Sequence, residues 1–221
     1  VEALLVAAGH EKAADEADAD VVIINSCTVR QKAEEKAVGK AGNMVAAGKI
    51  VGLMGCAVKR MGEDTFKRLP KLHFAVGPRM FGVIPKIIAD GKYPCLELGD
   101  PDVVPSGMDA HPDIQRGGTT GAFQSYVTVL LGCDNRCSYC IVPEVRGHEY
   151  SRPAKEVIAE VKALAARGVK EVCLLGQSVL RYGVRNKAWE ADEPNESGKT
   201  YTKLQYDRFC RACDALEERG V

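Results

Sequence analysis

The chain has 221 residues, of which 46% are hydrophobic and 27% are charged, a composition that predicts a folded globular protein and excludes an intrinsically disordered one. Its 30 basic and 30 acidic side chains cancel, so the net charge by itself gives no sign of a nucleic-acid partner. The sequence has no apolar run of about 18 residues and no signal peptide at its start, so we expect a cytoplasmic location and no membrane contact.

Short apolar runs alternate with helical patterns over the first hundred residues. The apolar runs predict three strands, at 21–24, 50–54 and 74–76. The helical patterns predict three helices, at 34–45, 63–69 and 81–89. Continuous apolar strands that alternate with helices are typical of a parallel sheet covered by helices. We therefore expect residues 1–98 to form an open parallel-sheet α/β domain that is truncated at its start.

The second half of the chain begins a new α/β unit. Periodicity is lost at 99–122, where prolines and glycines are frequent, and this stretch is predicted to be an interdomain linker. A strand is predicted at 125–131, followed by a cysteine-rich loop, an amphipathic helix that ends at Gly168 and another strand at 171–175. This order predicts a partial (β/α) barrel over residues 123–221, truncated at its end.

Nine cysteines in such a chain favour metal binding or catalysis over disulfides, and their odd number fits a disulfide framework poorly. Cys133, Cys137 and Cys140 have the spacing C-x-x-x-C-x-x-C directly after the strand predicted at 125–131. Thiolates are the soft ligands that iron–sulfur clusters need, and three ligands for four irons leave one iron open to a reactant. The alternatives are a zinc site that includes His148, and three buried cysteines without a ligand.

Two further cysteines follow predicted strands in the first half. Cys27 and Cys56 lie one to three residues after the strands at 21–24 and 50–54, which places both at the carboxyl edge of the predicted sheet. This edge is where ligands bind in parallel α/β sheets. By position alone, two separate core cysteines are an equally good interpretation.

The motifs resemble those of a known family. The run G-C-D-N-R-C-S-Y-C at 132–140, with the aromatic Tyr139 before the last cysteine, resembles the radical S-adenosylmethionine (SAM) superfamily. The runs I-V-P-E-V-R-G-H-E-Y-S-R-P at 141–153 and L-L-G-Q-S-V at 174–179 are similar to its methylthiotransferases, in particular the tRNA 2-methylthioadenosine synthases. In the first half, I-N-S-C-T-V-R at 24–30 and G-C-A-V-K-R-M-G-E at 55–63 are similar to the segments that supply ligands of that family's second cluster.

The resemblance implies two 4Fe-4S clusters and a radical SAM barrel. Cys133, Cys137 and Cys140 would hold the cluster that binds SAM and cleaves it to a 5′-deoxyadenosyl radical. The same resemblance gives the second cluster to Cys27 and Cys56, with a third cysteine upstream of Val1. An electron donor protein such as flavodoxin or ferredoxin is implied as a partner. Tyr139 and Gln177 are the residues that we expect beside SAM.

The resemblance implies that the reaction is methylthiolation of adenosine at ring carbon 2, next to the anticodon of tRNA. Residues 21–92 contain 13 basic and 5 acidic side chains, an excess that suits an anticodon stem-loop, although solvated lysines give the same pattern. The candidate substrate contacts are Arg30, Lys59, Arg60 and Arg146. One alternative is methylthiolation of an aspartate in a ribosomal protein, because the enzymes of that type share both cluster motifs. The runs at 146–153 and 174–179 favour the tRNA type, although Ser178 replaces the asparagine usual in the tRNA enzymes. The other alternative is a non-catalytic metal-binding module that interacts with RNA.

Overall fold

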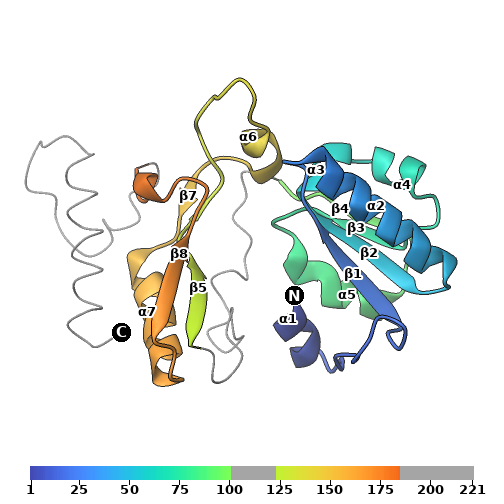
Figure 1. Cartoon of the computed structure of the whole chain (residues 1–221), viewed down its shortest axis with the longest axis horizontal. Helices are drawn as coiled ribbons and strands as arrows, with labels where there is room; N and C mark the ends of the chain where they lie inside the picture. Colours follow the sequence, from blue (N-terminus) through green and yellow to red (C-terminus); the bar gives the residue numbers. More distant parts are fainter. Residues whose placement is uncertain (101–122, 185–221) are drawn as a thin grey trace, which may run out of the picture. The chain divides into compact units, whose positions relative to one another are not determined.

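The computed structural model describes residues 1–100 and 123–184. These residues fall into two compact units, one made of 1–100 with 135–147 and the other of 123–134 with 148–184 (Figure 1). Most of the predicted linker at 99–122, and the chain beyond residue 184, lie outside the described residues. The domain boundaries at 98 and 123 therefore remain a prediction.

The first unit contains a sheet of four parallel strands in the order β1-β2-β3-β4 (Figure 1). The strands are β1 (Val21–Ser26), β2 (Ile50–Gly55), β3 (Phe74–Val76) and β4 (Cys95–Glu97). The three predicted strands are confirmed, and β4 is an addition. Unlike β3, it ends in the charged Glu97 and forms no continuous apolar run, so pairing with β3 identifies it as a strand.

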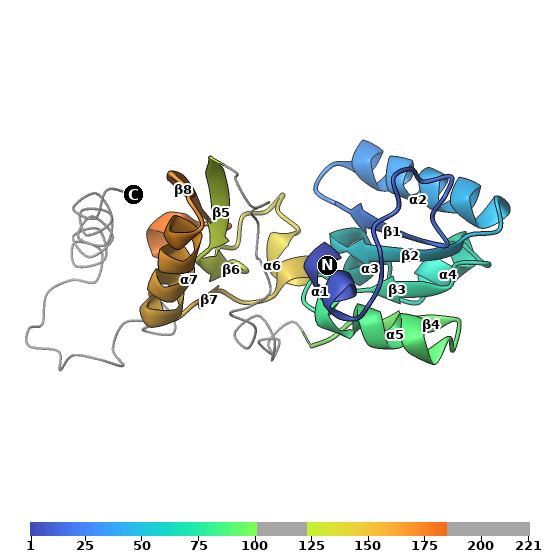
Figure 2. The ribbon, with the colours of Figure 1, turned by 90° about the horizontal axis from the view of Figure 1, so that it is seen from below.

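Helices cover both faces of this sheet, as the continuous apolar strands predict (Figure 2). The helices are α1 (Glu2–Ala7), α2 (Gln31–Ala46), α3 (Cys56–Met61), α4 (Asp64–Arg68), η1 (Phe81–Val83) and α5 (Ile84–Asp90). Leu53 packs with α2 and α3 in one core, while Phe74 packs with α5 in the other. Both side chains are fully buried, and each contributes about 1.5–3 kcal/mol to stability by its burial.

The second unit is a β-α-β arrangement. Strands β5 (Gln124–Thr128) and β8 (Glu171–Leu175) pair in parallel, and α7 (Ala154–Ala166) lies between them in the sequence. Val161 and Leu164 of α7 pack on Val127 and Leu130 in a single core. A parallel strand pair joined by a helix is the repeating unit of (β/α) barrels, as predicted.

The single strand predicted at 125–131 divides into β5 and β6 (Leu130–Leu131) at Val129. The N–H of Val129 donates to the carbonyl of Leu175 at 2.8 Å, while its carbonyl accepts from the N–H of Arg152 at 2.9 Å. Val129 is therefore the point at which the chain changes partner, and β6 pairs antiparallel with β7 (Tyr150–Ser151). This change depends on a segment about twenty residues away, which no local pattern reports.

Where the chain is described, it contains no helix with the length and apolar character needed to cross a membrane.

Candidate functional site

Cys27 and Cys56 begin the segments that follow two neighbouring strands. Ser26, the last residue of β1, pairs with Gly55, the last residue of β2, so both thiols lie at the carboxyl edge of the same sheet. Cys27 is exposed in the loop before α2, whereas Cys56 is the first residue of α3 and only 3% exposed. Neither forms a disulfide. The structure thus brings both thiols to the edge at which parallel sheets bind ligands.

The ends of these two strands are held close together. The buried hydroxyl of Ser26 donates to the carbonyl of Met54 at 2.6 Å. Gly55 has a φ of 101°, and a Cβ at this position would lie 2.5 Å from the carbonyl oxygen of Ser26. Only glycine meets both conditions without displacing β1. The spacing between the two cysteine-bearing segments therefore depends on this glycine.

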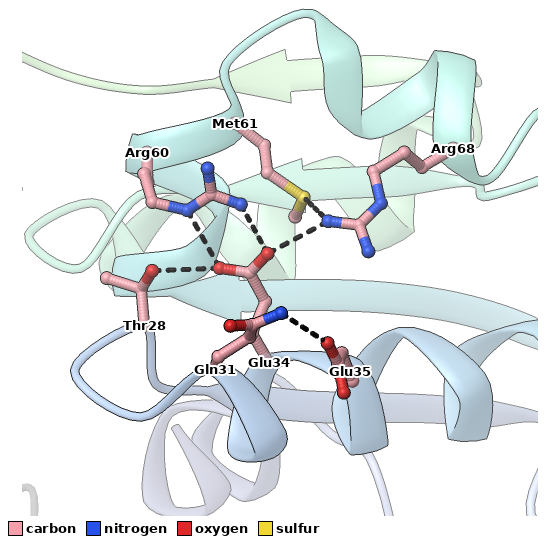
Figure 3. Close-up of polar contacts among 7 residues, drawn as sticks. All are labelled: Thr28, Gln31, Glu34, Glu35, Arg60, Met61 and Arg68. Carbon is pink, nitrogen blue, oxygen red and sulfur yellow. Dashed lines mark hydrogen bonds and ion pairs between the residues drawn. The ribbon is translucent and has the colours of Figure 1, made fainter.

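A buried carboxylate lies beside both segments. Glu34, in the first turn of α2, is 6% exposed, and it accepts hydrogen bonds from Thr28, Arg60 and Arg68 (Figure 3). Burial by itself would raise the pKa of the Glu34 carboxyl, but the hydrogen bonds from Arg60, Thr28 and Arg68 outweigh it and lower that pKa below its usual value. Glu34 is therefore a carboxylate at neutral pH, and its charge is balanced by two guanidinium groups.

The three basic residues proposed near these thiols differ in their surroundings. Arg60 is bound by Glu34, and the Lys59 ammonium donates to the carbonyls of Gly99 at 2.7 Å and Leu98 at 3.5 Å. Arg30 is exposed at the start of α2. Contact of all three with RNA remains a prediction. Arg60 and Lys59 have structural roles as well, so their replacement tests folding together with binding.

The three-cysteine loop follows β6. Gly132, with a φ of 71°, turns the chain out of the strand, and the N–H of Cys140 donates to the carbonyl of Cys137 at 3.0 Å. Cys133 is buried, Cys137 is exposed and Cys140 is half-buried, and all three are free thiols. Free, soft sulfur donors at this spacing fit a 4Fe-4S cluster chemically. Over 1–100 and 123–184, no three His, Cys, Asp or Glu side chains are already gathered in a metal-binding geometry.

The residues expected beside SAM are both exposed. Tyr139 is 90% exposed in the three-cysteine loop. Gln177 follows β8 directly after Gly176, where an added Cβ would lie 3.0 Å from the Cβ of Leu130. This close approach brings the β8 end against β6. A role for either residue in binding SAM remains a prediction.

Arg146 has a partner that the sequence does not indicate. It is the last residue of α6 (Val142–Arg146), which belongs to the first unit, and its Nε–H donates to the sulfur of Cys56 at 2.8 Å. The sequence motif predicts a contact between Arg146 and substrate. The structure places its guanidinium on a thiol proposed as a cluster ligand, and contact with substrate remains a prediction.

Comparison with protein families matches both halves of the chain. Residues 1–77 match the family described as "Uncharacterized protein family UPF0004", and residues 127–220 match the Radical SAM superfamily. Relatives from Dictyoglomus thermophilum and Fervidobacterium nodosum are 39% and 40% identical over 173 and 183 residues, which is 75% and 83% of this chain. Both are named tRNA-2-methylthio-N(6)-dimethylallyladenosine synthase. The chain belongs to the radical SAM methylthiotransferase family.

The chain spans only about two fifths of these relatives, 38% and 41% of their own lengths. Among solved structures, it is similar to the radical SAM methyltransferase TsrM from Kitasatospora setae, in a structure with cobalamin and a [4Fe-4S] cluster bound. That similarity has a TM-score of 0.52 at 12% identity and covers 90% of this chain and 43% of TsrM. It supports the α/β fold predicted from the sequence.

The sequence of this chain indicates the thiols themselves but not the residues that surround them. Glu34 and Arg68 have no distinguishing pattern, although Glu34 is the first acidic residue in the basic segment 21–92, and Thr28 was missed although it lies in the motif at 24–30. Glu149 was missed too, although it lies in the motif at 141–153. Its fully buried side chain accepts from the Nε of Arg181 at 2.6 Å. A charged side chain of this kind can be recognised as structurally important only when its burial is known, because most charged residues are exposed.

Proposed function

We propose that the protein containing this chain methylthiolates tRNA at ring carbon 2 of the adenosine beside the anticodon, with SAM and two 4Fe-4S clusters. The observation that carries this proposal is the presence of two separate groups of free cysteines on a chain 39–40% identical to enzymes named for that product. Residues 1–98 would form the domain of the second cluster, 99–122 a linker and 123–221 the radical SAM core.

The three-cysteine loop would hold the first cluster. Cys133, Cys137 and Cys140 would ligate three of its irons, which leaves the fourth iron for SAM. The bound cluster and SAM supply the one-electron chemistry that makes a 5′-deoxyadenosyl radical. Tyr139 offers an exposed aromatic face for the nucleoside, and Gln177 offers an amide at the carboxyl end of β8.

The second cluster would be held by Cys27 and Cys56, together with a ligand from elsewhere in the whole protein. Their different exposure suits the task, because the buried Cys56 fixes the site while the exposed Cys27 leaves one side accessible. Sulfur chemistry would take place there, and Arg30, three residues after Cys27, is exposed. The exposed guanidinium of Arg30 suits a phosphate of the anticodon stem-loop. A reductant of the flavodoxin or ferredoxin class would act with the enzyme in the cytoplasm.

Arg146 should tune the second cluster. Hydrogen bonds to ligand sulfur help to set cluster potentials, and a guanidinium stabilises the more negative, reduced state. We expect Arg146→Gln in the full-length protein to shift the midpoint potential of the second cluster to more negative values in an EPR-monitored redox titration. Arg136→Gln, which changes an exposed arginine of the three-cysteine loop, is the matched control and should leave the potential unchanged. An unshifted potential together with weaker tRNA binding would return Arg146 to the substrate-contact role.

The substrate is tested by giving the full-length, reduced enzyme both candidates. Undermodified tRNA and ribosomal protein would be incubated together with the enzyme and SAM, then digested and analysed by mass spectrometry. We expect a methylthio group on adenosine and none on protein aspartate. Product on aspartate alone would support the ribosomal-protein alternative.

The metal content of the same preparation tests the proposal at a coarser level. After anaerobic purification we expect iron and sulfide in about equal amounts, as in 4Fe-4S clusters. Zinc without iron, and no cleavage of SAM, would contradict the enzyme assignment and favour a metal-binding RNA module.

A further inference from the structure

We propose that Glu34 is a positioning residue that holds the Cys27 loop and the Cys56 helix in place for the second cluster. This inference rests on the proposed function and names the residue that organises one of its two metal sites. Cys27 and Cys56 come from different strands, and a shared cluster requires their sulfur atoms at a restricted separation. The strand pairing of Ser26 with Gly55 sets where each segment starts, but not the path of the loop after Cys27.

One oxygen of Glu34 connects the two segments directly. Oε2 accepts from the hydroxyl of Thr28 at 2.8 Å and from the Nε of Arg60 at 2.8 Å. Thr28 is the residue after Cys27, and Arg60 lies four residues after Cys56, about one turn further along α3. A single carboxylate oxygen therefore bonds to both of the segments that carry the thiols.

The other oxygen fixes the carboxylate itself. Oε1 accepts from Arg68 of α4 at 2.8 Å and also pairs with the Nη2 of Arg60 (Figure 3). Arg68 in turn donates to the sulfur of Met61 at 3.3 Å, which ties α4 to the end of α3. Charge-assisted bonds of this type are short and directional. Glu34 is thus held in place by α3 and α4, and its bond to Thr28 anchors the loop that follows Cys27.

The adjacent residue provides an internal comparison. Glu35 is exposed and accepts from the side chain of Gln31, one turn earlier on α2, at 2.8 Å (Figure 3). Glu34 and Glu35 have the same chemistry and lie on the same helix, but only Glu34 contacts the thiol-bearing segments. A difference between their variants therefore reports on those contacts and not on the loss of a negative charge from α2.

Anchoring the loop matters because a cluster needs its ligands together. If the hydrogen bond of Thr28 is lost, the exposed Cys27 segment samples more conformations. Cluster binding must then offset the conformational entropy that is lost when this segment becomes ordered. Replacing a residue that orients a metal ligand typically lowers metal affinity or activity by about 10–100-fold. The effect of Glu34 should therefore appear in retention of the second cluster more than in folding of the apoprotein.

The test uses the full-length protein with Cys133, Cys137 and Cys140 replaced by alanine, so that all bound iron belongs to the second cluster. This parent, Thr28→Val, Glu34→Gln and Glu35→Gln would be reconstituted anaerobically with iron and sulfide. Two quantities would be measured, namely the rate of iron release to a chelator and the midpoint of thermal unfolding of each apoprotein. Thr28→Val is the decisive variant, because it removes one hydrogen bond and leaves both ion pairs of Glu34 intact.

We expect iron release about tenfold faster than in the parent, or more, for Thr28→Val and Glu34→Gln, and unchanged for Glu35→Gln. The unfolding midpoint of apo Thr28→Val should stay close to that of the parent. Release at the parent's rate in both variants would overturn the inference and leave the proposed function standing. Faster release only in variants whose apoprotein unfolds earlier would also overturn it, in favour of a purely stabilising role. A parent that retains no iron would contradict the second cluster itself.

Discussion

Replacing Cys137 by alanine in the full-length enzyme should abolish formation of 5′-deoxyadenosine from SAM under reducing conditions. Cys137 is one of three thiols in a single loop, and a cluster with two remaining ligands cannot keep one iron available to SAM in a defined geometry. Because Cys137 is exposed, its truncation removes no core packing, and we expect the folded protein to be unchanged. The product would be measured by chromatography and mass spectrometry after anaerobic reconstitution.

Cys173→Ala is the matched control for this loss. Cys173 is a free thiol on β8 in the same half of the chain, but it lies outside the three-cysteine motif. It should keep SAM cleavage, together with its full complement of iron. Cleavage that survives in Cys137→Ala would show that this loop does not hold the SAM cluster.

Replacing Cys56 by alanine should separate the two halves of the reaction. SAM cleavage should stay measurable because the three-cysteine loop is intact, while methylthio-adenosine in tRNA should fall below detection because the second cluster loses a ligand. The substitution removes a buried sulfur and leaves a small cavity, a cost of about 1 kcal/mol that a folded enzyme tolerates. The two readouts are 5′-deoxyadenosine and the modified nucleoside, measured in the same reaction.

The control for Cys56 is Cys95→Ala, which removes a thiol from β4 of the same sheet. Burial, together with Glu97 and Asp90, raises the pKa of the Cys95 thiol, so Cys95 is a poor source of thiolate for a metal. Cys95→Ala should retain both activities. Methylthio product at the normal level in Cys56→Ala would make Cys56 a core cysteine and remove the second cluster from the proposal.

The alternation of apolar runs and helical patterns was sufficient to predict strands β1, β2, β3 and β8 and the helices α2 and α7. It also predicted the short helices α4 and α5, at 63–69 and 81–89, but it missed α3, α6 and β4. Helix α3 has six residues directly after β2, and four of them, Cys56, Ala57, Val58 and Met61, are buried, so its pattern continues that of the strand. Its helical character depends on Gly55, where a positive φ ends the strand. A sequence pattern reports which residues are apolar, not where the backbone changes direction.

Arg60 and Arg146 show how the same limit affects the site. Their positions near cysteines in the sequence suggested contacts of both positively charged arginines with phosphates. Folding places the carboxylate of Glu34, 26 residues earlier in the chain, against Arg60. It places the thiol of Cys56, 90 residues earlier, against Arg146. Coulomb attraction between such groups depends on separation in space and on burial, neither of which follows from position along the chain.

The sequence by itself determined the chemistry available to this protein: free thiols at two spacings, an apolar pattern for parallel α/β units, and motifs similar to methylthiotransferases. These properties are local, because a few consecutive residues are enough to specify a ligand loop or a strand. Only the tertiary structure decided that Ser26 and Gly55 end side by side, and that Glu34 joins Thr28 to Arg60. Such contacts join separate elements, so they exist only after strand register and helix packing have brought distant side chains within hydrogen-bond distance.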